Sequence, residues 1–256
     1  MGDFSHRPGA ALVLGASGGL GRATARMLLE RGADVALTYF RSAQALEPLL
    51  AAADAQGSTT RAWQLDLSDS ARAAEVVTQA AETFGGIHTL VYAAGPHVPM
   101  VHLSKVTPAD LERQVVGDVA GFFNAVHPAL PHLRASRGNI VDVTSAGTSR
   151  YTVRDGLSIG PKGAVEAMVR GIAAEEGRYG VRANSVGPGM TTDGTADRLI
   201  ASGDLDKNAL DVARSRIPLG TFGNAEDIAE AVCFLASDRA DFISGQKLDV
   251  DGGYSV

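Results

Sequence analysis

The chain of 256 residues has a single cysteine, a single tryptophan and only 5% aromatic residues. One cysteine excludes a disulfide within the chain. It lies in the apolar stretch Ile228-Ala-Glu-Ala-Val-Cys-Phe-Leu-Ala, where helical spacing puts Cys233 on the apolar side and favours burial in the core over catalysis. No pair of histidine, cysteine or acidic residues has the spacing of metal ligands, so no metal site is predicted.

An excess of positive charge is also missing, since the formal net charge is −6. Without a basic stripe to neutralise phosphates, the chain is not expected to bind nucleic acid. The longest apolar runs are too short to span a bilayer, so no membrane association is expected. The polar start Met1-Gly-Asp-Phe-Ser-His-Arg-Pro lacks the features of a secretory signal, which indicates a cytoplasmic protein. With 45% hydrophobic and 20% charged residues, the composition is typical of a globular core.

Glycine is abundant by contrast, and four glycines cluster directly after a short apolar run. Residues 10–21 read Ala-Ala-Leu-Val-Leu-Gly-Ala-Ser-Gly-Gly-Leu-Gly. A buried strand needs a tight exit here and the backbone must approach phosphates closely, which glycine allows because it has no Cβ. The helix that follows offers free N–H groups and a positive dipole end. An ordinary turn is the alternative, but the βαβ context with a second strand at 34–39 favours a pyrophosphate site.

Strand and helix patterns alternate along the whole chain. Strands are predicted at 10–15, 34–39, 61–66, 88–93, 139–144, 181–186 and 246–250. Helices are predicted at 20–31, 43–56, 69–84, 108–133, 159–178 and 225–237. Such alternation predicts an α/β fold, a doubly wound parallel sheet of about seven strands with helices on both faces.

No linker or repeat divides the chain, and one domain over residues 1–256 is therefore expected. The segment 191–217 is the least regular part. Because ligands of such sheets bind beyond the carboxyl ends of the strands, this segment is expected to form a substrate lid. A plain surface excursion is the alternative.

Further motifs follow the predicted strands at fixed places. They are Asp66-Leu67, Tyr92-Ala-Ala-Gly95, Ser145, Lys162 in the next helix, Pro188-Gly189, Gly245-Gln246 and Val250-Asp-Gly-Gly253. Together with the glycine turn, this set resembles the short-chain dehydrogenase/reductase superfamily over essentially the whole chain. The resemblance implies a Rossmann-like single domain, a nicotinamide cofactor, a small-molecule substrate and usually a homotetramer, or another homo-oligomer such as a dimer.

The resemblance also implies which residues bind the cofactor. The pyrophosphate would be lined by Gly15, Ser17, Gly19, Leu20 and Gly21. The adenine would meet Asp66 and Leu67, and the adenine-side ribose would lie near Ala93, Ala94 and Gly95. Pro188 and Gly189 follow the sixth strand and complete the set. For Asp66, a local role in the turn at the start of a helix is the alternative.

The end of the second strand indicates which nicotinamide cofactor is used. A carboxylate there would bond the ribose hydroxyls of NAD and repel a 2′-phosphate. The stretch Thr38-Tyr-Phe-Arg-Ser42 has no acid but a cation and a hydroxyl. Arg41 and Ser42 therefore favour NADP(H). Arg41 as a solvated surface charge is the alternative.

The expected catalytic residues depart from the family pattern. Most members have a tyrosine four residues before the active-site lysine, and here that position is Ser158, a much weaker acid. A branch similar to the enoyl-acyl-carrier-protein reductases has its tyrosine seven residues before the lysine, where this chain has Asp155. The usual asparagine of the fourth helix is replaced by Asp118, whose charge would favour the protonated form of Lys162. Lys162 is expected to bind the nicotinamide ribose.

The remaining candidates for proton chemistry are Tyr151, Asp155, Ser145, Asp118, His97 and His102. The phenol of Tyr151 lies in the loop that walls the substrate site, and aromatic lining is its alternative role. Asp155 would need a pKa raised by burial to act as an acid near neutrality. The two histidines are candidates because an unperturbed imidazole changes charge near neutral pH, although loop histidines usually face solvent.

Three functions fit this pattern. The first is an NADPH-dependent reductase of a ketone, imine or enone, free or carrier-bound, with an atypical proton donor. The second is a cyclase, dehydratase or isomerase on the same fold. The third is a nucleotide-binding protein without catalysis. Intact cofactor motifs beside an incomplete proton relay are compatible with all three.

Overall fold

A computed structural model describes residues 2–95, 98–192 and 207–256. Its centre is a seven-stranded sheet of order β3-β2-β1-β4-β5-β6-β7, in which every neighbouring pair is parallel. The strands are β1 (Ala10–Leu14), β2 (Asp34–Tyr39), β3 (Thr60–Gln64), β4 (Ile87–Tyr92), β5 (Asn139–Val143), β6 (Arg182–Pro188) and β7 (Lys247–Val250). The predicted doubly wound α/β fold is confirmed. The strand order reverses between β1 and β4, which is where ligands bind in such sheets.

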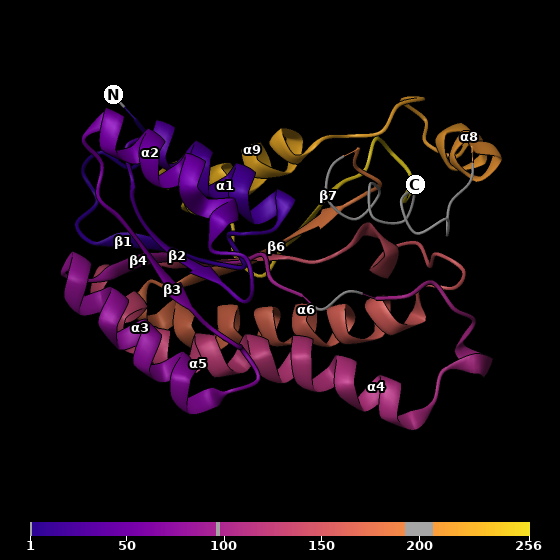
Figure 1. Ribbon diagram of the computed structural model, residues 1–256, viewed down its shortest axis with the longest axis horizontal. Helices are drawn as coiled ribbons and strands as arrows, with labels where there is room; N and C mark the ends of the chain where they lie inside the picture. Colours follow the sequence, from indigo (N-terminus) through magenta and orange to yellow (C-terminus); the bar gives the residue numbers. More distant parts are fainter. Residues whose placement is uncertain (1, 96–97, 193–206) are drawn as a thin grey trace.

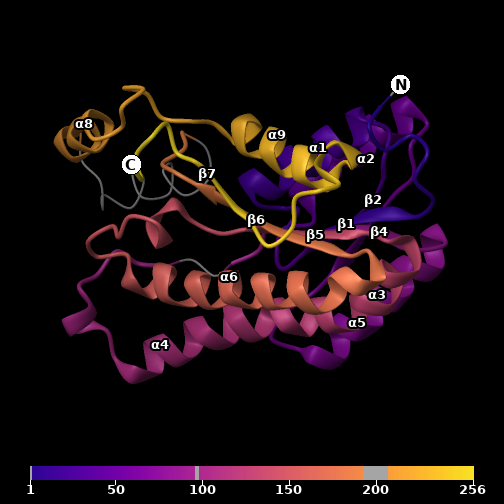
Figure 2. The ribbon, with the colours of Figure 1, turned by 180° about the vertical axis from the view of Figure 1, so that it is seen from behind.

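Helices cover both faces of the sheet (Figures 1 and 2). One layer consists of α1 (Gly19–Glu30), α2 (Glu47–Gln56) and α9 (Ala225–Ala236). The other consists of α3 (Ser70–Phe84), α5 (Gly121–Ser136) and α6 (Gly156–Glu176). Each face buries its own apolar core, and Cys233 of α9 is fully buried in one of them, as predicted.

The central strands are buried on both faces. All five residues of β1 and all six of β4 are buried, which parallel strands between two helical layers require. The edge strand β3 is more exposed, and Trp63 is the one buried residue among its five. Helices α2 and α3 end at Gly57 and Gly85, whose left-handed backbone terminates each helix.

The long helix predicted at 108–133 is interrupted. It begins as α4 (Pro108–Gln114), continues through the π-helical segment η3 (Val115–Ala120), and ends as α5 at Ser136. A π turn widens the helix by one residue and is common at functional sites. Similarly, α6 begins at Gly156, three residues before the predicted start at 159.

Of the predicted lid at 191–217, residues 193–206 lie outside the described residues, and so does His97. The described remainder includes α8 (Lys207–Ser215), which lies near the C-terminus at one end of the molecule (Figure 1). In the described residues, no helix combines the length and apolarity needed to cross a membrane.

Candidate functional site

The glycine turn after β1 folds tightly against the end of β4. Gly15 has a φ of 79°, and a Cβ there would lie 2.8 Å from the Cα of Ala94. A Cβ on Gly21 would lie 2.4 Å from the carbonyl oxygen of Gly15. The N–H of Gly15 donates to the Thr38 hydroxyl at 3.1 Å, which holds the turn to β2. Only glycine fits both positions.

The same turn leads into α1 with its first N–H groups open. Gly18 precedes the helix and has no side chain to cap it, and the first turn carries no acidic residue. An anion can therefore take up the free donors and the positive dipole end. The geometry has the features of a pyrophosphate cradle.

The other residues predicted for the cofactor follow the carboxyl ends of parallel strands, which places them along one edge of the sheet. Arg41 and Ser42 follow β2 and are exposed. The Arg41 guanidinium lies 4.8 Å from the centre of the Phe40 ring, and within the described residues it forms no ion pair. Such a cation is open to an anionic group of a ligand.

Asp66 and Leu67 follow β3 at this edge. The Oδ1 atom of Asp66 accepts from the backbone N–H and the hydroxyl of Ser68, at 2.9 and 2.7 Å. Asp66 therefore does stabilise the turn at the start of α3, the alternative role considered from the sequence. This role uses only one of its two carboxylate oxygens, Oδ1. The carbonyl oxygen of Leu67 accepts from the side-chain amide of Asn124 on α5 at 2.8 Å, which fixes this loop.

Lys162 and Asp118 form a buried ion pair next to the glycine turn. The lysine Nζ lies 3.1 Å from the Asp118 Oδ1, and the two side chains are 12% and 5% exposed. The same Nζ donates to the carbonyl oxygen of Ala94 at 3.5 Å. The Tyr92 hydroxyl donates to the Asp118 carbonyl oxygen at 3.1 Å. Asp118 thus lies beside the lysine, as the sequence predicts, and the π-helical segment brings it there.

Ser145, Asp155 and Ser158 lie around the start of α6. The Ser145 Oγ accepts from the N–H of Gly147 at 3.0 Å, so its hydroxyl proton stays available to another group. Asp155 precedes α6 without capping it, and burial raises its pKa to about 6. Ser158 is half-buried in the first turn of that helix.

Tyr151 and His102 lie further out. Tyr151 is 52% exposed, and its hydroxyl would lie 2.9 Å from a Cβ on Gly156, so the phenol is directed at the first residue of α6. His102 is exposed in the segment after β4. The Tyr151 hydroxyl therefore lies at the N-terminal end of α6, and His102 lies at the surface.

Sequence reasoning missed a buried polar layer beside these residues. Glu166, one helical turn after Lys162, accepts from the hydroxyls of Thr144 and Thr148, each at 2.6 Å. Lys247 of β7 lies 3.4 Å from the same carboxylate. Asp142 in β5 is completely buried. The only signals in the sequence are single charged residues within apolar stretches.

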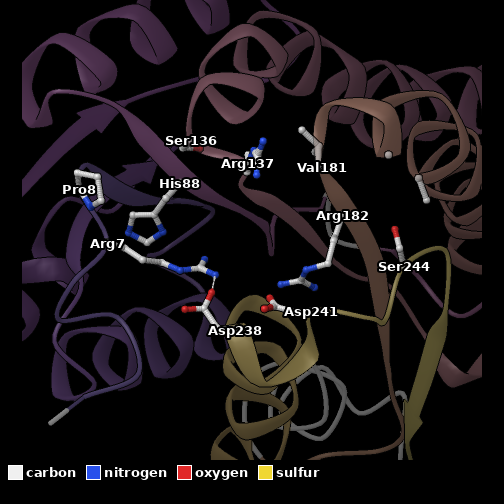
Figure 3. A pocket seen from close by; sticks show the side chains of 13 residues that line it. Arg7, Pro8, His88, Ser136, Arg137, Val181, Arg182, Asp238, Asp241 and Ser244 are labelled. Atoms are coloured by element: carbon white, nitrogen blue, oxygen red, sulfur yellow. Dashed lines mark hydrogen bonds and ion pairs between the residues drawn. The ribbon is translucent and has the colours of Figure 1, made fainter.

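A cavity of about 570 Å³ lies at the opposite, amino edge of the sheet (Figure 3). Arg7 and Arg182 line it, and both donate to carbonyl oxygens at the end of α9, Arg7 to Ala236 at 3.1 Å and Arg182 to Leu235 at 2.8 Å. In Figure 3 Arg7 also reaches Asp238. These guanidinium groups stabilise the carboxyl end of a helix. The cavity is remote from the glycine turn.

Within the described residues, no group of three or more histidine, cysteine or acidic side chains could hold a metal ion.

Fold and site together define a doubly wound nucleotide-binding protein with a lysine beside the glycine turn and a serine directly after β5. The chain belongs to the short-chain dehydrogenase/reductase superfamily, and the family described as Enoyl-(Acyl carrier protein) reductase matches residues 15–255.

Curated relatives match over nearly the whole chain. It is 32% identical to versicolorin reductase stcU of Emericella nidulans over 249 residues, which cover 95% of this chain and 94% of that protein. It is 31% identical to the 3-oxoacyl-[acyl-carrier-protein] reductase FabG of Staphylococcus aureus over 244 residues, 95% of this chain and 96% of the other. These relatives support an oxidoreductase.

Solved structures are similar as well. A short-chain dehydrogenase from Burkholderia cenocepacia in complex with NADP matches with a TM-score of 0.89 and 31% identity, covering 98% of this chain and 100% of that one. A blue fluorescent protein from a metagenomic library in complex with NADPH matches with a TM-score of 0.86 and 31% identity, with the same coverage.

Proposed function

We propose that the protein is an NADPH-dependent reductase that transfers a hydride to a ketone, imine or enone-type small molecule, free or carrier-bound. The observation that carries this proposal is the position of Lys162. Its Nζ is bound to Asp118 and to the carbonyl oxygen of Ala94, the residue against which Gly15 packs. The cation of Lys162 is thus linked through Ala94 to the glycine turn that we propose to bind the pyrophosphate.

The residues at the cradle fit NADP(H). Side chains on Gly15 or Gly21 would fill the space where the backbone closes, and the exposed Arg41 suits a 2′-phosphate. Two similar structures were solved with NADP or NADPH, which supports the same choice. The proposed cofactor-binding residues are Gly15, Ser17, Gly19, Leu20, Gly21, Arg41, Ser42, Asp66, Leu67, Ala93, Ala94, Gly95, Lys162, Pro188 and Gly189. When bound, the cofactor would supply the hydride.

The chain's own residues would bind and polarise the substrate. The Ser145 hydroxyl, whose oxygen already accepts from Gly147, can donate to the substrate oxygen or nitrogen and stabilise the negative charge that forms there. Lys162 would bind the nicotinamide ribose through its remaining protons and contribute positive potential.

The proton donor is proposed to be atypical. Asp155 is the leading candidate, because burial raises its pKa to about 6 and it precedes the helix that carries Ser158 and Lys162. Tyr151 is the alternative, since its phenol is directed at the same end of α6. Reduction of an enone tolerates the missing tyrosine best, because hydride addition to carbon leaves an enolate that can take its proton later from solvent.

The chain is further proposed to act as one domain in a homo-oligomer. Apolar side chains are exposed along the helix from α4 to α5, among them Leu111, Val116 and Phe123, and such surfaces favour association. The segment 191–217 remains the proposed substrate lid, since it follows β6 at the carboxyl edge of the sheet.

The test is oxidation of NADPH with a panel of ketones, quinones, enones and imines. Activity on one class that is lost in Lys162→Ala is the expected result. Tight NADPH binding without oxidation by any member of the panel would contradict a reductase. Conversion of a substrate without a change in the reduced nicotinamide absorbance would instead indicate an acid–base reaction such as cyclisation or dehydration.

A further inference from the structure

Besides Asp118 and Glu166, a third carboxyl group, that of Asp142, is buried in this part of the protein. Asp142 is 0% exposed in the middle of β5, where it pairs in register with Tyr92 of β4 and Ser185 of β6. Ile140, two residues earlier and on the same side of the strand, packs in the core beneath α6. Asp142 therefore faces the layer that contains Lys162.

The carboxyl group of Asp142 has few hydrogen-bond partners. The Ser185 hydroxyl donates to its Oδ2 at a long 3.4 Å. In the described part of the chain, Oδ1 has no hydrogen-bond partner. An ionised carboxylate without strong donors or a cation is very unfavourable in the interior, whereas a protonated carboxyl is far less so.

In the described part of the chain, the cations near Asp142 are paired with other carboxylates. The facing groups are Lys162 and Glu166 on α6, Asp118 on η3 and the Tyr92 phenol on β4. Lys162 is bound to Asp118, and Lys247 lies between Glu166 and Asp249 at 3.4 and 2.9 Å. Both lysines of the layer are therefore taken by other carboxylates.

The electrostatic balance agrees with the contacts. Burial raises the pKa of Asp142, Lys162 opposes the rise, and the carboxylates of Asp118 and Glu166 add to it, for a value of about 7. Ionisation would place an additional negative charge below the site where hydride transfer creates negative charge on the substrate. Transition-state stabilisation by Ser145 and Lys162 would then be partly cancelled.

We propose that Asp142 is a positioning residue that is protonated in the working enzyme, and that its neutral carboxyl keeps the electrostatic field of Lys162 available to the substrate. This inference rests on the proposed reductase function. Asp142 itself does not touch the substrate in this scheme, because it acts through the lysine above it.

The protonation of Asp142 can be measured without activity. The protein is labelled with ¹³C at the aspartate carboxyl carbon, and the carboxyl shifts are followed by NMR as the pH is raised. One resonance that titrates near pH 7 in the wild type should be missing in Asp142→Asn. Asp155→Asn serves as the matched control and should remove a different titration, near pH 6. An Asp142 carboxyl that is already ionised at pH 6 in the wild type would overturn the inference whether or not the protein is a reductase.

The effect on the reaction is tested by the pH dependence of kcat/KM. In the wild type, kcat/KM should fall about tenfold as the pH rises through 7, and this step should be absent in Asp142→Asn. Ser185→Ala removes the hydroxyl donor of Asp142 and should shift the step to higher pH, which provides a second variant if Asp142→Asn does not fold. A step that is unchanged in both variants would contradict the role of Asp142 and leave the reductase function intact.

Discussion

Separating Lys162 from Asp118 should destabilise the fold far more than breaking an exposed ion pair. The two charges lie 3.1 Å apart on side chains that are 12% and 5% exposed. At that distance an effective dielectric constant of about 20 gives about 5 kcal/mol of attraction, part of which is cancelled by desolvation. Removing one partner leaves the other charge buried, and we therefore expect each single variant to lose about 3 kcal/mol of unfolding free energy.

A double-mutant cycle measures the interaction itself. Urea unfolding of Asp118→Asn, Lys162→Met and the double variant should give a coupling energy of about 2–4 kcal/mol. The pair Arg72 and Glu75, 2.7 Å apart with side chains 36% and 54% exposed, is the matched control and should give less than about 1 kcal/mol. A coupling energy for the buried pair no larger than that of the control pair would refute the reasoning.

Four further predictions concern the cofactor and the proton donor. Arg41→Asp should bind NADH more tightly than NADPH, whereas the wild type should prefer NADPH, and binding titrations measure both. An unchanged preference would remove Arg41 from the cofactor site. In Gly15→Ala the new Cβ would lie 2.8 Å from the Ala94 Cα, on a residue whose φ is 79°. The substitution should therefore lower the free energy of unfolding by about 2–4 kcal/mol and weaken NADPH binding. Gly57→Ala, with a φ of 70° and no atom within 4 Å, is its control and should cost only about 1 kcal/mol; equal losses would contradict the close approach. Tyr151→Phe should slow turnover at least about tenfold, or about 1.4 kcal/mol, if the phenol is the acid. If Asp155 is the acid, turnover should fall as the pH rises through about 6, and Asp155→Asn should be slow and lack this step, whereas wild-type rates in that variant would exclude it.

The sequence alone predicted the sheet, and it indicated the edge that we propose for the cofactor, because both depend on local patterns. Apolar runs and helical spacing located each of the seven strands to within a few residues. The glycine positions follow from the steric requirements of one turn. The pair of Lys162 and Asp118 was also predictable, but only through the resemblance to a family, since the two residues are 44 positions apart.

Only the tertiary structure decided which acidic residues are buried and which charges surround them. The π-helical segment that carries Asp118 has no distinct local sequence pattern. In the sequence, Asp142 is only a single polar residue in an otherwise apolar strand, and nothing nearby indicates its burial. The polar layer around Asp142 forms because α6 packs over β5 and brings Glu166 and Lys162 above it. Burial among other carboxylates, which no local stretch of sequence specifies, is the physical reason that the pKa of Asp142 is raised to about 7.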